Sequence, residues 1–183
     1  GAPQPVRTVV IDMPDAGQAA VYLVGRGPER SDAAWYPLDL ANAVLGGGSN
    51  GRLFEEVRNR RSLSYGAYSQ LGALRDDPLI SANAQTANET VDEVVAVMLG
   101  EYARLGAEPL SDDLLARRRL FLSGGRSRAL ESSAGYASIM LDLLALGIDP
   151  AEAALYAQRL DGVSGDAASA AAQQYFAPDQ TTL

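Results

Sequence analysis

The sequence predicts an α+β fold, in which helices pack on one face of a mainly antiparallel sheet. Three observations predict this class. Strand-like segments come in pairs before and after one helix, and a series of helical patterns follows them. Strand and helix do not alternate as they would in a doubly wound parallel sheet. The 183 residues also show no internal repeat and no long linker, so we expect a single domain over residues 1–183.

The expected strands are short runs of alternating or continuous apolar residues, and turn residues separate them. They cover residues 6–13, 18–25, 62–73 and 79–85, and a last strand begins at residue 180. The run at 18–25 is apolar enough to be a central strand, because such strands are buried on both faces. Residues 75–78 form the expected hairpin loop between the third and fourth strands.

The expected helices have apolar residues at helical spacing, with capping residues before them and glycine after them. They span about 33–45, 88–105, 111–124, 132–146 and 164–175, and one more begins at the capping box 149–152. The expected N-terminal caps are Ser31, Asn88, Ser111 and Ser164. We expect the third of these helices to end or bend at Gly124-Gly125, because glycine weakens a helix.

Residue types that are missing from the chain exclude several kinds of chemistry. There is no histidine, no cysteine and no lysine, and all 15 basic residues are arginine. Without histidine and cysteine there is no His-based zinc site, no thiolate and no Ser-His or Cys-His nucleophile. Without lysine there is no Schiff base and no phosphate-loop lysine. We therefore expect no metal ligand set and no catalytic residue in this chain.

The overall charge and hydropathy exclude two further classes of partner. The net charge of −8 argues against nucleic acid, because binding to phosphates needs a basic surplus. No apolar run reaches the roughly 18 residues of a membrane helix, so we expect no membrane partner. The lack of cysteine does not identify a compartment.

Several polar or glycine-rich clusters have structural explanations. Arg117-Arg118-Arg119 fits a solvated helix face, because the three side chains point around the helix in different directions. The acidic pairs at 55–56, 76–77 and 112–113 fit a helix surface, a loop and a helix start, so we assign them no catalytic role. The run 46–51 follows a helix and lacks Gly-Lys-Ser/Thr, which favours a helix end and connector over a phosphate loop.

Residues 40–69 hold the strongest candidate for a functional site. An apolar helix end runs into a glycine cluster, and a short amphipathic helix and an alternating, strand-like run follow. Arg58 at the end of the short helix and Tyr65 at the start of the strand could project into one place. Two alternatives remain open from spacing alone: Arg58 could pair with Glu55 or another acid, and Tyr65 could belong to the core.

This stretch resembles the C-terminal domain of the insulinase/pitrilysin zinc peptidases, the family that includes the mitochondrial processing peptidases. The family pattern is Asn before Leu-Gly-Gly, then Ser-x-Arg-Leu-Phe-x-x-(Leu/Val)-Arg, and Tyr after six more residues. The positions that fit are Asn42, Leu45, Gly46, Gly47, Arg52, Leu53, Phe54, Val57, Arg58 and Tyr65. Two positions depart from it: Ser62 stands where the family usually has glycine, and Gly51 stands where it usually has serine.

The resemblance implies a zinc-free domain that works with a zinc-bearing domain or subunit, together forming a chamber around an extended peptide. In such peptidases an arginine and a tyrosine, here Arg58 and Tyr65, hydrogen-bond backbone oxygens of the peptide. Both groups are hydrogen-bond donors, which suits that role. The glycine-rich loop lines the chamber and touches the partner half; its residues here are Gly46, Gly47, Gly48, Ser49 and Asn50. Zinc is expected in the partner domain, because the family's His-x-x-Glu-His signature is missing from this chain.

The resemblance leaves two roles open, and a third possibility lies outside it. The first role is the substrate-binding half of a zinc metallopeptidase, inactive alone. The second is a non-proteolytic structural subunit, because family members in respiratory complexes keep the fold without proteolysis. An unrelated binding module would require the motif match to be accidental. Analogy with bacterial peptide-degrading pairs favours the periplasm as the compartment.

Overall fold

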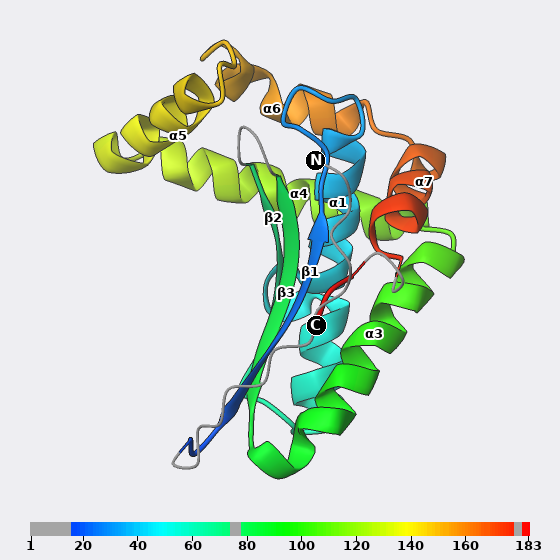
Figure 1. The fold of residues 1–183 in the computed structure, drawn as a ribbon. Coiled ribbons are helices and arrows are strands. Elements are labelled where there is room, and N and C mark those ends of the chain that lie inside the picture. Colours follow the sequence, from blue (N-terminus) through cyan, green and yellow to red (C-terminus); the bar gives the residue numbers. More distant parts are fainter. Residues whose placement is uncertain (1–15, 74–77, 178–180) are drawn as a thin grey trace, which may run out of the picture.

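A computed structural model describes residues 16–73, 78–177 and 181–183, and it confirms the α+β class (Figure 1). The strands in these ranges are β1 (Ala19–Arg26), β2 (Ala67–Gly72) and β3 (Leu79–Thr86). The longer helices are α1 (Trp35–Gly46), α3 (Val91–Ala107), α4 (Asp112–Leu130), α5 (Ser133–Ala145), α6 (Glu152–Asp161) and α7 (Gly165–Tyr175). The expected strand at 6–13 and most of the expected loop at 75–78 lie outside the described residues.

The three strands form an antiparallel sheet in the order β1-β3-β2. Tyr22 on β1 and Tyr68 on β2 both pair with Asn83 on β3, so these three residues form one row across the sheet. The run 18–25 was expected to be a central strand; among the described strands β3 lies between β1 and β2, and the expected strand at 6–13 is outside the described residues. On its outer edge β1 makes one further bridge, from Val24 to Thr182, with two backbone hydrogen bonds of 2.8 Å. That bridge lies where the last strand was expected to begin.

Helices cover one face of the sheet, and the core lies beneath them. Along β3 the side chains alternate, and Ile80, Ala82 and Ala84 are buried on the covered face. Helix α1 is buried over most of its length because it contacts β2, α4 and α7. A helix surrounded in this way is mostly apolar on all sides, which explains why every residue from Leu40 to Leu45 is buried. Figure 1 shows α1 and α3 on the same side of the sheet.

The helix caps agree with the expectation in the second half of the chain and differ in the first. Ser111 and Ser164 each accept a hydrogen bond from a backbone N–H in the first turn of α4 and α7. Ser31 does not cap α1; instead the Asp32 carboxylate accepts a bond of 2.7 Å from the Ala34 N–H. Asn88 does not cap α3 either, because its side-chain amide donates to the Ala16 carbonyl. Asp and Asn make such local backbone contacts outside the cap position as well.

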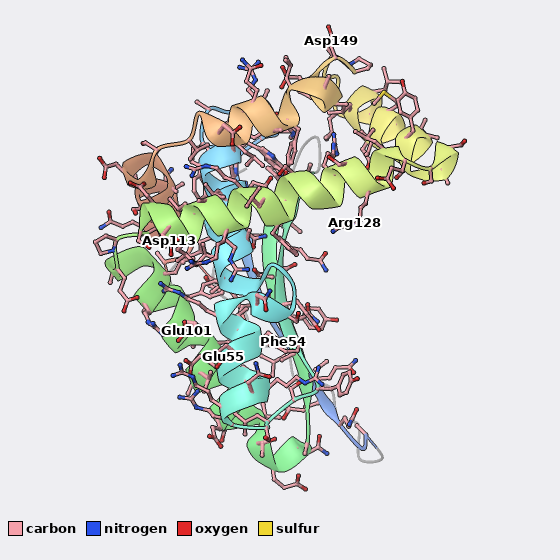
Figure 2. The ribbon with its side chains drawn as sticks, turned by 180° about the vertical axis from the view of Figure 1, so that it is seen from behind. Phe54, Glu55, Glu101, Asp113, Arg128 and Asp149 are labelled. Atoms are coloured by element: carbon pink, nitrogen blue, oxygen red, sulfur yellow. The ribbon has the colours of Figure 1, made fainter. Side chains whose placement is uncertain are left out.

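Helix α4 continues without a break to Leu130, so the expected end or bend at Gly124-Gly125 was wrong. Each glycine costs a helix about 1 kcal/mol relative to alanine. Packing offsets this cost, because α4 contacts α1, α5 and α6 along its length. In Figure 2, α4 crosses in front of α1 and the strands as one continuous helix. No helix in the described ranges is long and apolar enough to cross a bilayer.

The arginine run 117–119 is not a solvated helix face, contrary to the expectation. Arg118 is buried, and its guanidinium donates to the Asn50 carbonyl. Arg119 donates to two backbone carbonyls near the end of α6, at 3.1 and 2.6 Å. Two of the three arginines therefore tie α4 to neighbouring segments, because buried carbonyls need donors.

Candidate functional site

The predicted site residues lie on a helical segment that follows α1. The 3-10 turn η1 (Gly48–Asn50) leads into α2 (Arg52–Phe54), which continues directly as η2 (Glu55–Arg60). The sequence predicts a short helix here, but η2 is a π-helix. Such turns are rare and are found often at functional sites. Figure 2 shows this segment beside α3, with Phe54 on the side toward the strands.

Gly46 lets the end of α1 lie directly on β2. A Cβ atom at Gly46 would lie 2.2 Å from the backbone nitrogen of Ser69, which is far inside contact distance. Gly47 is similarly close to the backbone of Ala43. The glycines at the end of α1 are therefore required by packing, whatever else they do.

The loop after α1 is held from the other side by α4. Gly48 has a φ of 74°, and the ring of Phe121 packs against it. The Asn50 carbonyl accepts from Arg118, while Ser49 and Asn50 are exposed. Among the five predicted loop residues, these two have exposed side chains. The assignment of the loop to the chamber wall or partner contact stays a prediction.

A tight turn at Ser62 brings the chain back over the helix it has just left. The Leu63 N–H donates to the Val57 carbonyl at 2.9 Å, and the Ser62 N–H donates to the Arg58 carbonyl at 3.0 Å. Ser62 has a φ of 54°, in the left-handed region that favours glycine. This geometry explains why a glycine is usual at this position in the family that the sequence resembles.

Ser62→Gly is expected to stabilise the domain by about 0.5–1 kcal/mol, because it removes the Cβ strain of a left-handed residue. The gain is measured as a higher midpoint in urea unfolding. Ser138→Gly is the matched control, since Ser138 is exposed in the middle of α5. There the same change should destabilise by a similar amount. Equal losses of unfolding free energy from Ser62→Gly and Ser138→Gly would contradict backbone strain at Ser62.

The structure brings Arg58 and Tyr65 together. The guanidinium carbon of Arg58 lies 4.3 Å from the ring centroid of Tyr65 and 4.9 Å from that of Phe54. Tyr65 is 85 % exposed, so it is not a core residue. It lies just before β2 and not within it, because the strand begins at Ala67. Cation–π contacts with two rings hold the guanidinium in place and leave its N–H groups available.

Neither donor of the pair is engaged by another group in the described part of the chain. No hydrogen bond or ion pair to Arg58 or to the Tyr65 hydroxyl is present within those ranges. Glu55, the alternative partner of Arg58, instead accepts from Asn59 at 2.6 Å and from Arg60 at 3.4 Å. The bond from Asn59 is the main cause that lowers the pKa of Glu55.

Ion pairs to a buried carboxylate connect the π-helix to α3. The Glu56 carboxylate is buried and pairs with Arg60 at 3.2 Å and with Arg61. Arg104 on α3 lies 4.0 Å from the same carboxylate and 3.2 Å from Glu101. Three arginines therefore surround one buried carboxylate, and Glu56 links the segment that carries Arg58 to α3.

Tyr68 belongs to the same cluster and was not among the predicted site residues. The Tyr68 ring lies over Gly66, and a Cβ atom at Gly66 would come within 2.7 Å of that ring. The ring centroids of Tyr68 and Phe54 are 5.8 Å apart. The alternation of β2 contains the signal, because Ala67 and Ser69 are buried and Tyr68 between them points to the open face.

The available donors do not fit a zinc site. The sequence has no histidine and no cysteine, which are the usual zinc ligands. Within residues 16–73, 78–177 and 181–183, no three acidic side chains gather where they could hold a metal ion. No step that needs zinc is therefore assigned to residues of this chain.

Two cavities lie elsewhere in the fold. One of about 880 Å³ lies between the start of α1, α6 and α7, and one of about 330 Å³ lies between α1, α4 and α5. Their polar groups mostly satisfy one another: Tyr36 donates to Glu152 at 3.1 Å, and Tyr156 donates to Asp39 at 2.6 Å. Burial raises the pKa of Asp39 despite that hydrogen bond. Arg58 and Tyr65 line neither cavity, so we assign both cavities no part in the site.

Comparison with solved structures places this fold among known peptidase domains. The inactive peptidase domain from Bordetella parapertussis superposes with a TM-score of 0.80 and 20 % identity, over 94 % of each chain. A peptidase M16 inactive domain from Pseudomonas fluorescens gives 0.79 and 21 %, over 91 % of this chain and 40 % of that one. At these identities the likeness shows the fold alone.

Sequence comparison identifies the family. An uncharacterized zinc protease from Streptomyces coelicolor is 32 % identical over 116 residues, which is 63 % of this chain and 25 % of that protein. The chain thus spans about a quarter of the length of this curated relative. Residues 2–121 match the family described as the peptidase M16 inactive domain. The chain therefore belongs to the family of peptidase M16 inactive domains.

Proposed function

We propose that this domain binds the backbone of a peptide substrate through Arg58 and Tyr65, for cleavage by a zinc-bearing domain or subunit. The observation that carries the proposal is the geometry of the pair: the guanidinium carbon of Arg58 lies 4.3 Å from the ring centroid of the exposed Tyr65, and no described group occupies the N–H groups of Arg58 or the hydroxyl of Tyr65. Peptide carbonyls are acceptors, and a transition-state oxyanion accepts more strongly.

The residue types in this chain determine which part of the reaction we assign to it and which to the zinc-bearing partner. Activation of a water molecule by zinc needs ligands that this chain does not contain. A guanidinium and a phenol remain protonated at neutral pH and can orient an acceptor without exchanging a proton. The domain therefore contributes positioning and charge stabilisation, and the zinc-bearing partner contributes the reacting water.

The proposal is tested by reconstitution with the zinc-bearing half, taken from the same polypeptide or from an adjacent gene. Each part and their mixture are assayed with a quenched fluorescent peptide. This chain alone should hydrolyse no peptide and retain no stoichiometric zinc after washing. The mixture should exceed the zinc-bearing half alone by a hundredfold or more, because positioning converts binding energy into rate.

Two results would contradict the proposal. One is a zinc-bearing half that is fully active without this chain. The other is a tight complex of the two parts that hydrolyses none of a broad set of peptides, which would favour the structural-subunit role.

A further inference from the structure

Within the part of the chain that the structure describes, no helix covers the face of the sheet opposite α1 and α3. Helices pack on the side where Ala67, Ser69 and the alternate residues of β3 are buried. On the other side Tyr22 is 53 % exposed and Tyr68 is 37 % exposed. Side chains alternate across a strand, so the residues that share the orientation of these tyrosines form one surface.

Two adjacent rows across this open face contain no charged residue. The first row is Tyr22, Asn83 and Tyr68, and the second is Val24, Ser81 and Gln70. Yet the chain has 38 charged residues, 15 basic and 23 acidic, and a net charge of −8. Exposed surfaces usually carry such charges, and aromatic residues together with a lack of charge are typical of contact surfaces. We call these six residues the tyrosine strip.

The tyrosine strip is continuous with the proposed backbone-binding pair. From Tyr65 the contacts run to Arg58 at 4.3 Å, to Phe54 at 4.9 Å and on to Tyr68, whose ring is 5.8 Å from Phe54. Tyr68 then leads to Asn83 and Tyr22 through the strand register. A peptide held by Arg58 and Tyr65 would therefore have the strip as its neighbouring surface.

We propose that the tyrosine strip binds uncharged side chains of the substrate, with aromatic and aliphatic residues preferred and acidic residues disfavoured. This proposal rests on the proposed function, because it places the peptide by Arg58 and Tyr65. Tyrosine rings offer apolar area and a polar tip, and aromatic side chains pack well against them. None of the six strip residues is a cation that could pair with a buried carboxylate; in the register, Arg26 lies one row beyond them, opposite Leu79. The acidic net charge of the domain adds to this discrimination.

Substrate libraries combined with strip variants test the proposal in the assembled peptidase. The peptides compared have the same length. In each set one position carries Phe, Gly or Asp, and the varied position is moved along the peptide from set to set. The wild type should cleave the Phe peptide best and the Asp peptide worst at one or more positions. Tyr68→Ala and Tyr22→Ala should lower kcat/KM for the Phe peptide about two- to tenfold, the range expected for lost aromatic contacts. Tyr22→Ala should leave cleavage of the Gly peptide unchanged, because Tyr22 lies on β1 and β3 separates it from β2. Tyr68 packs on Phe54 beside the Arg58–Tyr65 pair, so for Tyr68→Ala the measured quantity is the ratio of kcat/KM for the Phe and Gly peptides.

Tyr136→Ala is the matched control, because Tyr136 on α5 is 54 % exposed and lies on another part of the fold. It should leave all peptides unaffected. Tyr65→Phe separates the two proposals, since loss of a backbone donor should slow every peptide by the same factor. If Tyr65→Phe has that effect while the strip variants leave the ratio of kcat/KM for the Phe and Gly peptides unchanged, the proposal for the tyrosine strip is overturned. The proposal for Arg58 and Tyr65 then stands.

The alternative occupant of the open face is the zinc-bearing partner itself. In that case Tyr68→Ala and Tyr22→Ala would weaken assembly of the two parts, measured by titration calorimetry, and would slow Phe and Gly peptides equally. That outcome overturns the proposal. Unchanged assembly together with a changed Phe/Gly ratio supports it.

Discussion

Tyr65→Phe is expected to lower the turnover of the assembled peptidase by on the order of a hundredfold, the usual effect of losing one oxyanion donor. The variant keeps the ring that packs on Arg58 and removes only the hydroxyl. It should fold normally, because Tyr65 is exposed and its hydroxyl bonds to no described group. Turnover and the Michaelis constant are measured with one peptide at saturating and limiting concentrations.

The two constants distinguish what the hydroxyl contacts. A fall in kcat indicates a bond that forms in the transition state, whereas a raised KM alone indicates a ground-state contact. Arg58→Lys should also be harmful, because lysine keeps the charge but loses the planar fork of donors and its stacking between two rings. Tyr136→Phe, at a comparably exposed tyrosine remote from the site, should change neither constant. Full activity of both Tyr65→Phe and Arg58→Lys would eliminate the proposed role of the pair.

Gly46→Ala is expected to destabilise the domain by about 3 kcal/mol, at the upper end of the range for overpacked cores. The added Cβ would lie 2.2 Å from the backbone nitrogen of Ser69 and 2.8 Å from the carbonyl carbon of Tyr68. Backbone atoms of a strand cannot rotate away as a side chain can, so α1 and β2 must separate. Urea unfolding measures the loss directly.

Gly100→Ala makes the same chemical change where there is space. Gly100 lies within α3, and a Cβ there would meet no atom within 4 Å. It should stabilise by up to about 1 kcal/mol, because alanine has the higher helix propensity. If Gly46→Ala unfolds with wild-type free energy, the close contact of α1 with β2 is not as described here.

Much of the fold could be predicted because its signals are local. The periodicity and caps of α4 and α7 depend on neighbouring residues, and both helices begin as expected at Ser111 and Ser164. The order of strands is not a local property. The apolar run of β1 does not indicate its partners: the structure pairs it with β3 on one edge and, at Val24, with Thr182 on the other.

The site was predictable in its residues and not in its geometry. The spacing of Arg58 and Tyr65 indicated convergence, and in the structure the guanidinium carbon of Arg58 lies 4.3 Å from the ring centroid of Tyr65. The π form of η2 and the left-handed turn at Ser62 bring the chain back toward Arg58. Neither feature could be predicted from the sequence. No residue pattern distinguishes a π-helix from an α-helix here, and serine seldom adopts a positive φ. Arg118 was misjudged because its carbonyl partner, Asn50, is distant in the sequence.

The most direct test of the central claim is a crystal structure of the assembled peptidase with a bound peptide, trapped by removing the zinc from the partner half. We expect the Tyr65 hydroxyl and the Arg58 guanidinium to lie within about 2.7–3.1 Å of backbone carbonyl oxygens of that peptide, the range of a good hydrogen bond. A peptide seated in the chamber with no backbone oxygen near either group would contradict the account.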